Sequence, residues 1–205
     1  MSRGIGLLGS GGQANEAASF YNGEVAFRAV HGSYVDADAS VDIKRPGKLR
    51  NYGVCVAVGA PALKRTLVKD WPGERFVSIV AESATVDPSA YVGEGCILAP
   101  NTVLTTNTVL GRHVLVNVGA SVQHDSVVGE FTTIGPGAHI GGHVEIGNGV
   151  YLGMGVNVKN GVSIADGVVL GMGATLITDA AEENGVYIGV PARLVSKRDD
   201  WLDEI

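Results

Sequence analysis

Residues 134–161, IGPGAHIGGHVEIGNGVYLGMGVNVKNG, carry an aliphatic residue at every sixth position. The same period continues in both directions without an insertion. A small or β-branched residue stands two positions before most of these aliphatic residues, and residues two apart face the same side of a strand. Each hexad is therefore expected to be a short strand with two inward side chains, followed by a corner. The aliphatic positions are Val80, Val86, Val92, Leu98, Leu104, Leu110, Val116, Val122, Val128, Ile134, Ile140, Ile146, Leu152, Val158, Ile164, Leu170 and Leu176.

The segments between these aliphatic positions are rich in glycine. Glycine often follows the aliphatic residue directly and recurs two positions later, as at Gly135 and Gly137. Glycine tolerates the positive φ angles that sharp corners need. The period excludes a helix, and a β-sandwich would show turn signals about every 8–12 residues. The sequence therefore predicts a parallel β-helix, a β solenoid with roughly three hexads in each triangular coil.

The residues before the repeat have the pattern of a small α/β unit. A continuous apolar run such as residues 54–59 is typical of a buried parallel strand. The pattern predicts a three-stranded, Rossmann-like βαβαβ unit. Its elements are a strand at 4–9, a helix within 13–30, a strand at 34–36, a strand at 54–59 and a helix over 60–69.

These patterns divide the chain into three parts. Residues 1–78 are expected to form the small α/β domain, and residues 79–180 the β-helix domain. Residues 181–205 are a C-terminal extension, whose acidic tail is expected to form a short helix and a cap.

Composition narrows the classes of function. The chain has 205 residues and a net charge of −6, which gives no basic face for nucleic acid. Cys55 and Cys96 lie in apolar patterns and are expected to be buried thiols in a reducing compartment. No signal peptide and no apolar run long enough to cross a membrane is recognisable. A cytoplasmic protein without membrane insertion is predicted.

The first predicted strand leads through a glycine-rich loop into a helix. This arrangement presents backbone N–H groups to a phosphate, and here the loop residues are Gly9, Ser10, Gly11 and Gly12. A structural tight turn is the alternative interpretation. Asp36, at the end of the second predicted strand, either faces a nucleotide ligand or is a solvated loop acid.

The string NVGASVQHDSVVG, residues 117–129, contains the strongest catalytic candidate. His124 stands two residues after the inward Val122, at a corner where side chains project outward. A carboxylate beside an imidazole, here Asp125, sets its tautomer and supports the imidazolium that forms on protonation. Histidine, with an unperturbed pKa of about 6.5, suits a general base at neutral pH. An ordinary surface histidine is the alternative.

The hexads and this string resemble the left-handed β-helix acyltransferases. Within that family the likeness is greatest to the bacterial-sugar branch, which comprises nucleotide-amino-sugar N-acetyltransferases and sialic acid O-acetyltransferases. It spans residues 4–194, and includes the motif Asn-x-Gly-Ala-x-Val-x-His-Asp/Glu at 117–125 and the ending Gly-Val-Pro-Ala-Arg at 189–193. The resemblance implies a left-handed coil, acetyl-CoA as co-substrate, no metal, and a homotrimer with its active site between subunits.

The resemblance also implies roles for individual residues. His124 matches the general base, and Asn117 matches an asparagine of the pocket. Gly142 follows His124 by 18 residues, one coil later, where a glycine N–H of the family stabilises the thioester oxyanion. A glycine needed only for its backbone conformation is the alternative for Gly142.

In the resembled family the N-terminal unit holds the nucleotide part of the sugar substrate. The glycine loop matches the family, but three other positions of this unit carry residues that differ from the usual ones. Gln13 stands where histidine is usual, Gly59 is followed by Ala-Pro instead of Asp-Asn, and Lys64 replaces an arginine. The expected substrate-binding residues are thus Gly9, Ser10, Gly11, Gly12, Gln13, Asp36, Gly59, Lys64 and Asn117.

The resemblance places the pantetheine arm of acetyl-CoA along a groove between subunits. Thr133 occupies the position of a second histidine found in several family members, and His143 stacks one coil above Asp125. Lys197 and Arg198 are further candidates for the CoA phosphates. The expected cofactor-binding residues are Thr133, His143, Met154, Gly155, Met172, Gly173 and Arg193.

Together these features predict an acetyl-CoA-dependent N-acetyltransferase for a nucleotide-linked amino sugar of surface-polysaccharide or glycan synthesis. A sugar or sialic acid O-acetyltransferase is the main alternative. A non-catalytic solenoid subunit is another. A γ-carbonic-anhydrase-like zinc enzyme is the third, for which the nearest histidine pair is His139-x3-His143. His113 and His139 are otherwise expected at the surface.

Overall fold

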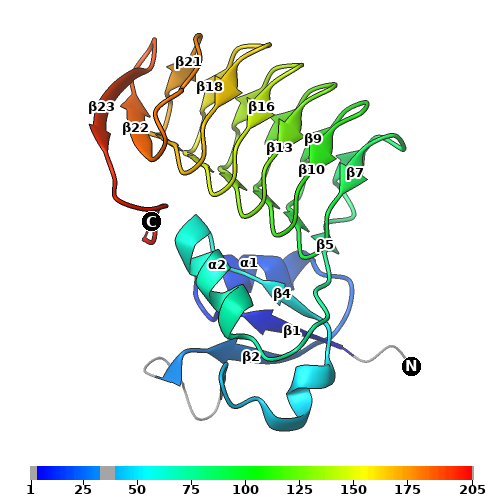
Figure 1. The fold of residues 1–205 in the computed structure, drawn as a ribbon. Helices are drawn as coiled ribbons and strands as arrows, with labels where there is room; N and C mark the ends of the chain where they lie inside the picture. Colours follow the sequence, from blue (N-terminus) through cyan, green and yellow to red (C-terminus); the bar gives the residue numbers. More distant parts are fainter. Residues whose placement is uncertain (1–3, 33–39, 205) are drawn as a thin grey trace.

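The computed structural model describes residues 4–32 and 40–204. The strand predicted at 34–36, with Asp36, lies outside the described residues. A small α/β domain stands beneath a solenoid of stacked coils, and the C-terminal segment runs back from the far end of the solenoid towards α2 (Figure 1).

The α/β domain contains a parallel sheet with strand order β3-β2-β1-β4. It thus has four described strands where three were predicted. Its second strand is β2, whose alternating Val-Ala-Phe-Arg-Ala-Val pattern favours a strand, so the helix expected within 13–30 is confined to α1. The elements are β1 (Ile5–Leu8), α1 (Gly12–Phe20), β2 (Val25–Val30), β3 (Val41–Asp42), a 3₁₀-helix (Gly47–Asn51), β4 (Val54–Val56) and α2 (Pro61–Asp70).

The solenoid confirms the six-residue period. Each strand pairs in parallel with the strand 18 residues later, as Val122 does with Ile140, so three hexads make one coil. The strands are β5 (Ile79–Val80), β6 (Thr85–Val86), β7 (Tyr91–Val92), β8 (Ile97–Leu98), β9 (Val103–Leu104), β10 (Val109–Leu110), β11 (Leu115–Val116), β12 (Ser121–Val122), β13 (Val127–Val128), β14 (Thr133–Ile134), β15 (His139–Ile140), β16 (Glu145–Ile146), β17 (Tyr151–Leu152), β18 (Asn157–Val158), β19 (Ser163–Ile164), β20 (Val169–Leu170) and β21 (Thr175–Leu176).

These strands form three sheets along the solenoid. Sheet 1 contains β5, β8, β11, β14, β17 and β20, sheet 2 contains β6, β9, β12, β15, β18 and β21, and sheet 3 contains β7, β10, β13, β16 and β19. The aliphatic residues from Leu98 to Leu176 are buried in the solenoid core. Val80 is an exception at 46% exposed, because the first coil has no coil beneath it to cover this position.

Sheet 1 is the face that carries the α/β domain. Its outward residues Ile79, Ile97 and Leu115 share a buried cluster with Leu7 of β1 and Ala14 of α1. Leu8, Val54 and Val56 belong to a second cluster with Leu67 and Trp71 of α2. Because neighbouring strand residues point to opposite faces, one face of the four-stranded sheet packs towards α1 and the solenoid and the other packs with α2.

The C-terminal extension continues sheet 1. Strand β22 (Gly185–Ile188) pairs in parallel with β20, and β23 (Arg193–Lys197) pairs antiparallel with β22. The short helix predicted for the tail is wrong, because no helix lies among the described residues after 197. Instead, Trp201 lies against the solenoid corners at Gly149 and Gly167, and Arg65 of α2 stacks over its ring at 4.3 Å.

His113 also departs from the prediction of a surface residue. Its side chain is 2% exposed and lies between Phe76, at 4.7 Å between ring centroids, and Phe131, at 5.1 Å. The α/β domain covers this corner, so burial lowers the pKa of His113 to about 4.

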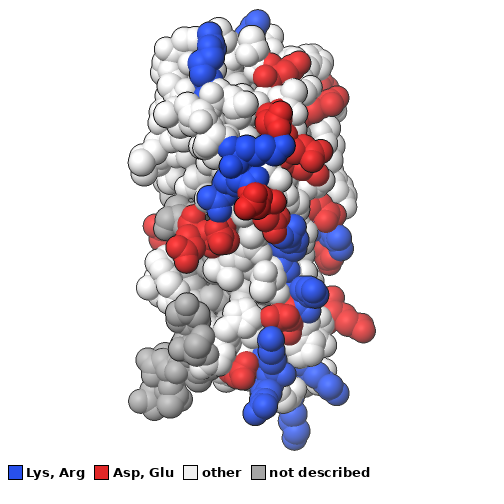
Figure 2. Space-filling model, turned by 60° about the vertical axis from the view of Figure 1, so that its left-hand side comes forward, with Lys and Arg blue, Asp and Glu red and all other residues white. Residues whose placement is uncertain are grey.

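Charged side chains of both signs are interspersed on the face seen in Figure 2. Arg112 forms ion pairs with Glu94 and Glu130 at 3.8 and 2.9 Å. Among the residues that the structure describes, no helix has the length and hydrophobicity needed to span a membrane.

Candidate active site

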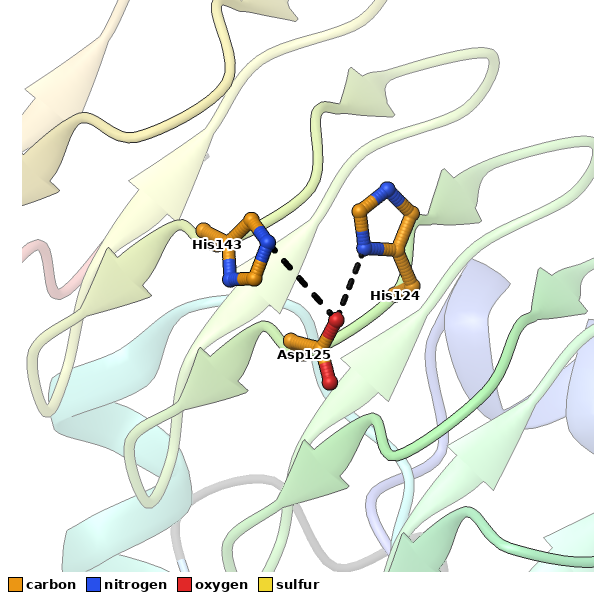
Figure 3. Close-up of side chains that lie close together, drawn as sticks. All are labelled: His124, Asp125 and His143. Atoms are coloured by element: carbon orange, nitrogen blue, oxygen red, sulfur yellow. Dashed lines mark hydrogen bonds and ion pairs between the residues drawn. The ribbon is translucent and has the colours of Figure 1, made fainter.

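His124 and Asp125 form the corner between β12 of sheet 2 and β13 of sheet 3. Asp125 has a φ of 58° and His143, at the same corner one coil later, has a φ of 56°. This left-handed conformation recurs at the solenoid corners, as at Asn107 and Phe131, so it belongs to the coil geometry. Figure 3 shows the three side chains converging outside this corner.

Asp125 fixes the orientation of the His124 imidazole. His124 Nδ1 lies 2.8 Å from Asp125 Oδ2, and Asn107 Nδ2 donates to the other carboxylate oxygen at 2.9 Å. The hydrogen bond from Asn107, followed by that from His124, holds the pKa of Asp125 below its ordinary value. The ionised carboxylate therefore accepts the Nδ1 proton, and His124 Nε2 is left with a free lone pair.

His143 reaches the same carboxylate from the next coil. Its Nε2 lies 3.7 Å from Asp125 Oδ2, and its ring stands nearly perpendicular to that of His124, with centroids 5.1 Å apart. The sequence placed His143 over Asp125 by its spacing of one coil, and this stacking is confirmed.

Gly142 lies directly against the His124 ring. A Cβ at this position would stand 2.6 Å from both Cε1 and Nε2 of the imidazole. The same corner position in other coils carries the side chains of Thr106 and Asn160, and Gly142 is not among the residues with positive φ. Its lack of a side chain is thus explained by the histidine rather than by backbone conformation. Among the described residues, no hydrogen bond uses its N–H group.

The glycine loop leads from β1 into α1 as predicted. Gly9 has a φ of 126° and packs against Ala57, whereas Ser10 and Gly11 are exposed at the start of α1. No hydrogen bond from the N–H groups of residues 10–13 is present within the described structure, as is usual at the N-terminus of a helix. Such free donors are able to accept an anion as a partner.

Arg28 was not singled out from the sequence but lies beside this loop. Its guanidinium donates to Asn15 Oδ1 at 2.7 Å and to the Ser10 carbonyl at 3.4 Å. An arginine in the middle of an otherwise apolar strand was the available signal, and the segment had been predicted as part of a helix-containing region.

Gln13 and Asn117 connect the two domains at the site. Asn117 Nδ2 donates to Gln13 Oε1 at 3.3 Å, and Asn117 Oδ1 accepts the N–H of Val118 at 2.7 Å. The Gln13 Nε2 group is buried and has no partner in the described part of the chain. Two residues predicted to bind substrate are therefore brought together, although they are far apart in the sequence.

Three other predicted ligand residues lie in the contact between α2 and the solenoid. Thr133 Oγ1 donates to the Gly59 carbonyl at 2.6 Å. Lys64 is 1% exposed, and its Nζ donates to the carbonyls of His113 at 3.1 Å and Thr132 at 2.9 Å. Burial lowers the pKa of Lys64 to about 7. These contacts give Lys64 and Thr133 a structural function in joining the domains.

The methionines predicted to contact CoA lie at a different corner from His124. Met154 and Met172 stand between sheet 1 and sheet 2, with Gly155 and Gly173 beside them, at the other end of the sheet 2 strands. They are 54% and 76% exposed. Arg193 is exposed after the turn between β22 and β23. One subunit therefore does not bring these residues to Gly142.

The histidine pair considered for zinc does not converge. His139 Nδ1 lies 2.9 Å from Ser121 Oγ on the outer face of sheet 2, away from His143 at the corner. Within the part of the chain that the structure describes, the group with the spacing of a metal site is His124, Asp125 and His143.

Comparison with known proteins identifies the class. The family model described as bacterial transferase hexapeptide (six repeats) matches residues 143–178. A search of curated proteins finds no match. PerB from Caulobacter crescentus, solved with CoA and GDP-perosamine, has a TM-score of 0.86 at 25% identity, with 95% of this chain and 98% of that chain covered.

Two further solved structures show the same arrangement. The acetyltransferase domain of PglB from Neisseria gonorrhoeae has a TM-score of 0.84 at 25% identity. The match covers 95% of this chain and 100% of the PglB chain. WeeI from Acinetobacter baumannii has a TM-score of 0.78 at 25% identity, with 94% and 99% covered. Fold and site together define a hexapeptide-repeat protein with a left-handed β-helix. More particularly, the chain is an acyltransferase similar to solved bacterial acetyltransferases, among them a perosamine N-acetyltransferase.

Proposed function

We propose that the chain transfers an acetyl group from acetyl-CoA to the amine of a nucleotide-linked amino sugar, for the synthesis of a surface polysaccharide or another glycan. The observation that carries this proposal is the His124–Asp125 pair beside Gly142, in a fold whose solved relatives include a perosamine N-acetyltransferase bound to CoA and GDP-perosamine. This geometry offers a base and an oxyanion donor at one place.

In the proposed reaction, the sugar amine attacks the thioester carbonyl carbon and a C–N bond forms. His124 Nε2 takes the proton that the nitrogen loses, and Asp125 stabilises the resulting imidazolium. The oxyanion accepts the free N–H of Gly142. The C–S bond then breaks, and the CoA thiolate leaves with the proton from His124. Atoms and charge balance without a metal or a redox cofactor.

A homotrimer with its active site between subunits would complete the site. Tyr91, Val109 and Val127 expose apolar side chains on successive coils of sheet 3, which borders the His124 corner. A second copy seated on this stripe would bring its own Met154 and Met172 corner, with Arg193, within reach of CoA. The methionine side chains suit the aliphatic pantetheine arm.

We propose that the nucleotide binds at the loop between β1 and α1. Free N–H groups at residues 10–13 and the guanidinium of Arg28 suit its phosphates, and Gln13 connects this loop to Asn117 of the solenoid. Gly9, with a φ of 126°, shapes the backbone of this loop, and Gly59 lies after β4, the neighbouring strand. Cys55 and Cys96 are free thiols, which supports a reducing compartment such as the cytoplasm.

The test is CoA thiol release with UDP-, GDP- and dTDP-linked amino sugars and with the corresponding hydroxy sugars. We expect turnover with an amino sugar, and a loss in kcat/KM of at least about 10²-fold for His124→Ala. His139→Ala is the matched control, because His139 is an exposed histidine outside the corner. Turnover of hydroxy sugars alone would show that the enzyme is an O-acetyltransferase instead of an N-acetyltransferase. Equal rates in wild type and His124→Ala would show that His124 is not the base.

A further inference from the structure

The His124 corner contains more than a base and its carboxylate partner. His124, Asp125 and His143 each offer one ligand atom, and these three atoms all lie within 4.8 Å of one another. Two of the separations are 2.8 Å, from His124 Nδ1 to Asp125 Oδ2, and 3.7 Å, from His143 Nε2 to the same oxygen. A catalytic histidine and its carboxylate do not by themselves require the second imidazole.

From this geometry we propose that His124, Asp125 and His143 bind a divalent transition-metal ion such as Zn²⁺, and that the bound ion switches off the acetyltransferase. Zinc–nitrogen bonds of about 2.0–2.1 Å place tetrahedral ligand atoms roughly 3.3 Å apart. The two separations from Asp125 Oδ2 bracket that value, and the two histidine nitrogens lie within 4.8 Å of each other, so side-chain rotations bring the three atoms to one ion. Two imidazoles with one carboxylate select zinc, cobalt, nickel or copper over magnesium or calcium.

The surroundings hold the ligands in place. Asn107 Nδ2 donates at 2.9 Å to Asp125 Oδ1, the carboxylate oxygen that faces away from the two histidines. Hydrogen bonds of this kind orient ligating carboxylates in metal sites. The His143 side chain is exposed, and its Nε2 faces Asp125 Oδ2 at 3.7 Å (Figure 3).

The ion and the base compete for one atom, His124 Nδ1. In the metal-free corner this nitrogen carries the proton donated to Asp125, and Nε2 has the free lone pair. A metal at Nδ1 displaces that proton, and the neutral imidazole then carries its single N–H at Nε2. The lone pair that would accept the amine proton is lost. This inhibitory half of the proposal rests on the proposed function, whereas metal binding does not.

Binding is tested by titrating tag-free protein with Zn²⁺ in a calorimeter and with Co²⁺ by visible absorption. We expect one Zn²⁺ per chain and a Co²⁺ spectrum of a nitrogen- and oxygen-ligated site, with no binding of Mg²⁺. His143→Asn keeps a residue that tolerates positive φ, and is expected to weaken Zn²⁺ binding by at least about tenfold. Asn107→Gly, which also tolerates the φ of 56° at this position, is expected to weaken it by about 10–100-fold through the carboxylate.

His139→Asn is the matched control, since it removes an exposed histidine that is bonded to Ser121 outside the cluster. Unchanged Zn²⁺ affinity in His139→Asn supports the site, whereas equal affinity in wild type and His143→Asn, or no Zn²⁺ binding at all, overturns it. In the CoA thiol-release assay, Zn²⁺ is expected to inhibit the wild type, and EDTA is expected to restore its activity. Inhibition of His143→Asn is expected to need a higher Zn²⁺ concentration. Zn²⁺ bound with full activity overturns the inhibitory half alone.

Discussion

At the scale of single residues, the site depends on a side chain that is missing. Thr106, His124 and Asn160 occupy the same corner position as Gly142 in neighbouring coils, so the backbone there accepts ordinary residues. Gly142 is glycine because the His124 ring fills the space where a Cβ would be. The imidazole thereby lies beside an N–H group that no other described group uses.

Gly142→Ala is expected to displace the His124 imidazole, because the added Cβ would stand 2.6 Å from its Cε1 and Nε2. The base loses its alignment with Asp125 and with the oxyanion position, so we expect kcat to fall by about 10²-fold or more. Steady-state kinetics of acetyl transfer measure the effect. Asn160→Ala, one coil away at the same corner position, is the control with unchanged kcat, and a fully active Gly142→Ala would contradict this account.

At the scale of elements, the C-terminal extension packs against both the solenoid and the α/β domain. Strands β22 and β23 continue sheet 1, and the tail then returns to α2, where Ala62 N–H donates to the Leu202 carbonyl at 3.0 Å. Trp201 fits against the side-chain-free corners at Gly149 and Gly167. The extension thus connects the far coils of the solenoid with the α/β domain.

Trp201→Ala is expected to lower the free energy of unfolding by about 1–3 kcal/mol. A fully buried tryptophan costs about 3–5 kcal/mol when truncated, and Trp201 is only partly buried. Urea unfolding followed by far-UV circular dichroism measures the change. Asp203→Ala is the control, since its exposed ion pair with Arg198 contributes at most about 1 kcal/mol. Equal midpoints for Trp201→Ala and wild type would show that the tail does not hold the domains.

At the scale of the whole molecule, the contact between the domains contains a buried lysine. Lys64 crosses from α2 to the solenoid, and its two carbonyl partners match the two N–H donors of a neutral amine. Burial lowers its pKa to about 7, raises that of Cys96 to about 11 and also raises that of Cys55. All three groups are therefore disfavoured in their charged forms.

The stability of the protein should consequently rise between pH 7 and pH 8. In this window the unfolded chain keeps the Lys64 proton and the folded chain releases it, so the free energy of unfolding increases with pH by about 1 kcal/mol. The thiols act in the opposite direction as the pH approaches their pKa of about 8.5 in the unfolded chain, and they offset the rise above about pH 8. Lys64→Met is expected to remove the rise between pH 7 and pH 8, as measured by urea unfolding at each pH. Lys69→Met, an exposed lysine of the same helix, should retain it, and a wild-type stability that falls from pH 7 to pH 8 would refute the assignment.

The sequence alone determined the solenoid, the coil length of 18 residues and the location of the His124 corner. A strict period repeats the same local choice in every coil, and a spacing of 18 stacks Gly142 over His124 and His143 over Asp125 without reference to the rest of the fold. Strand β2 was missed because its pattern occurs only once in the chain, so no repeat reinforces its local preference.

Only the tertiary structure decided which face of the solenoid is covered. Docking of the α/β domain on sheet 1 buries His113, Lys64 and Thr133, three polar residues that local patterns place at the surface or in a ligand site. It also brings Gln13 to Asn117 and Arg28 to the glycine loop. These contacts join residues far apart in the chain, and their burial depends on packing between domains, which a local sequence period does not encode.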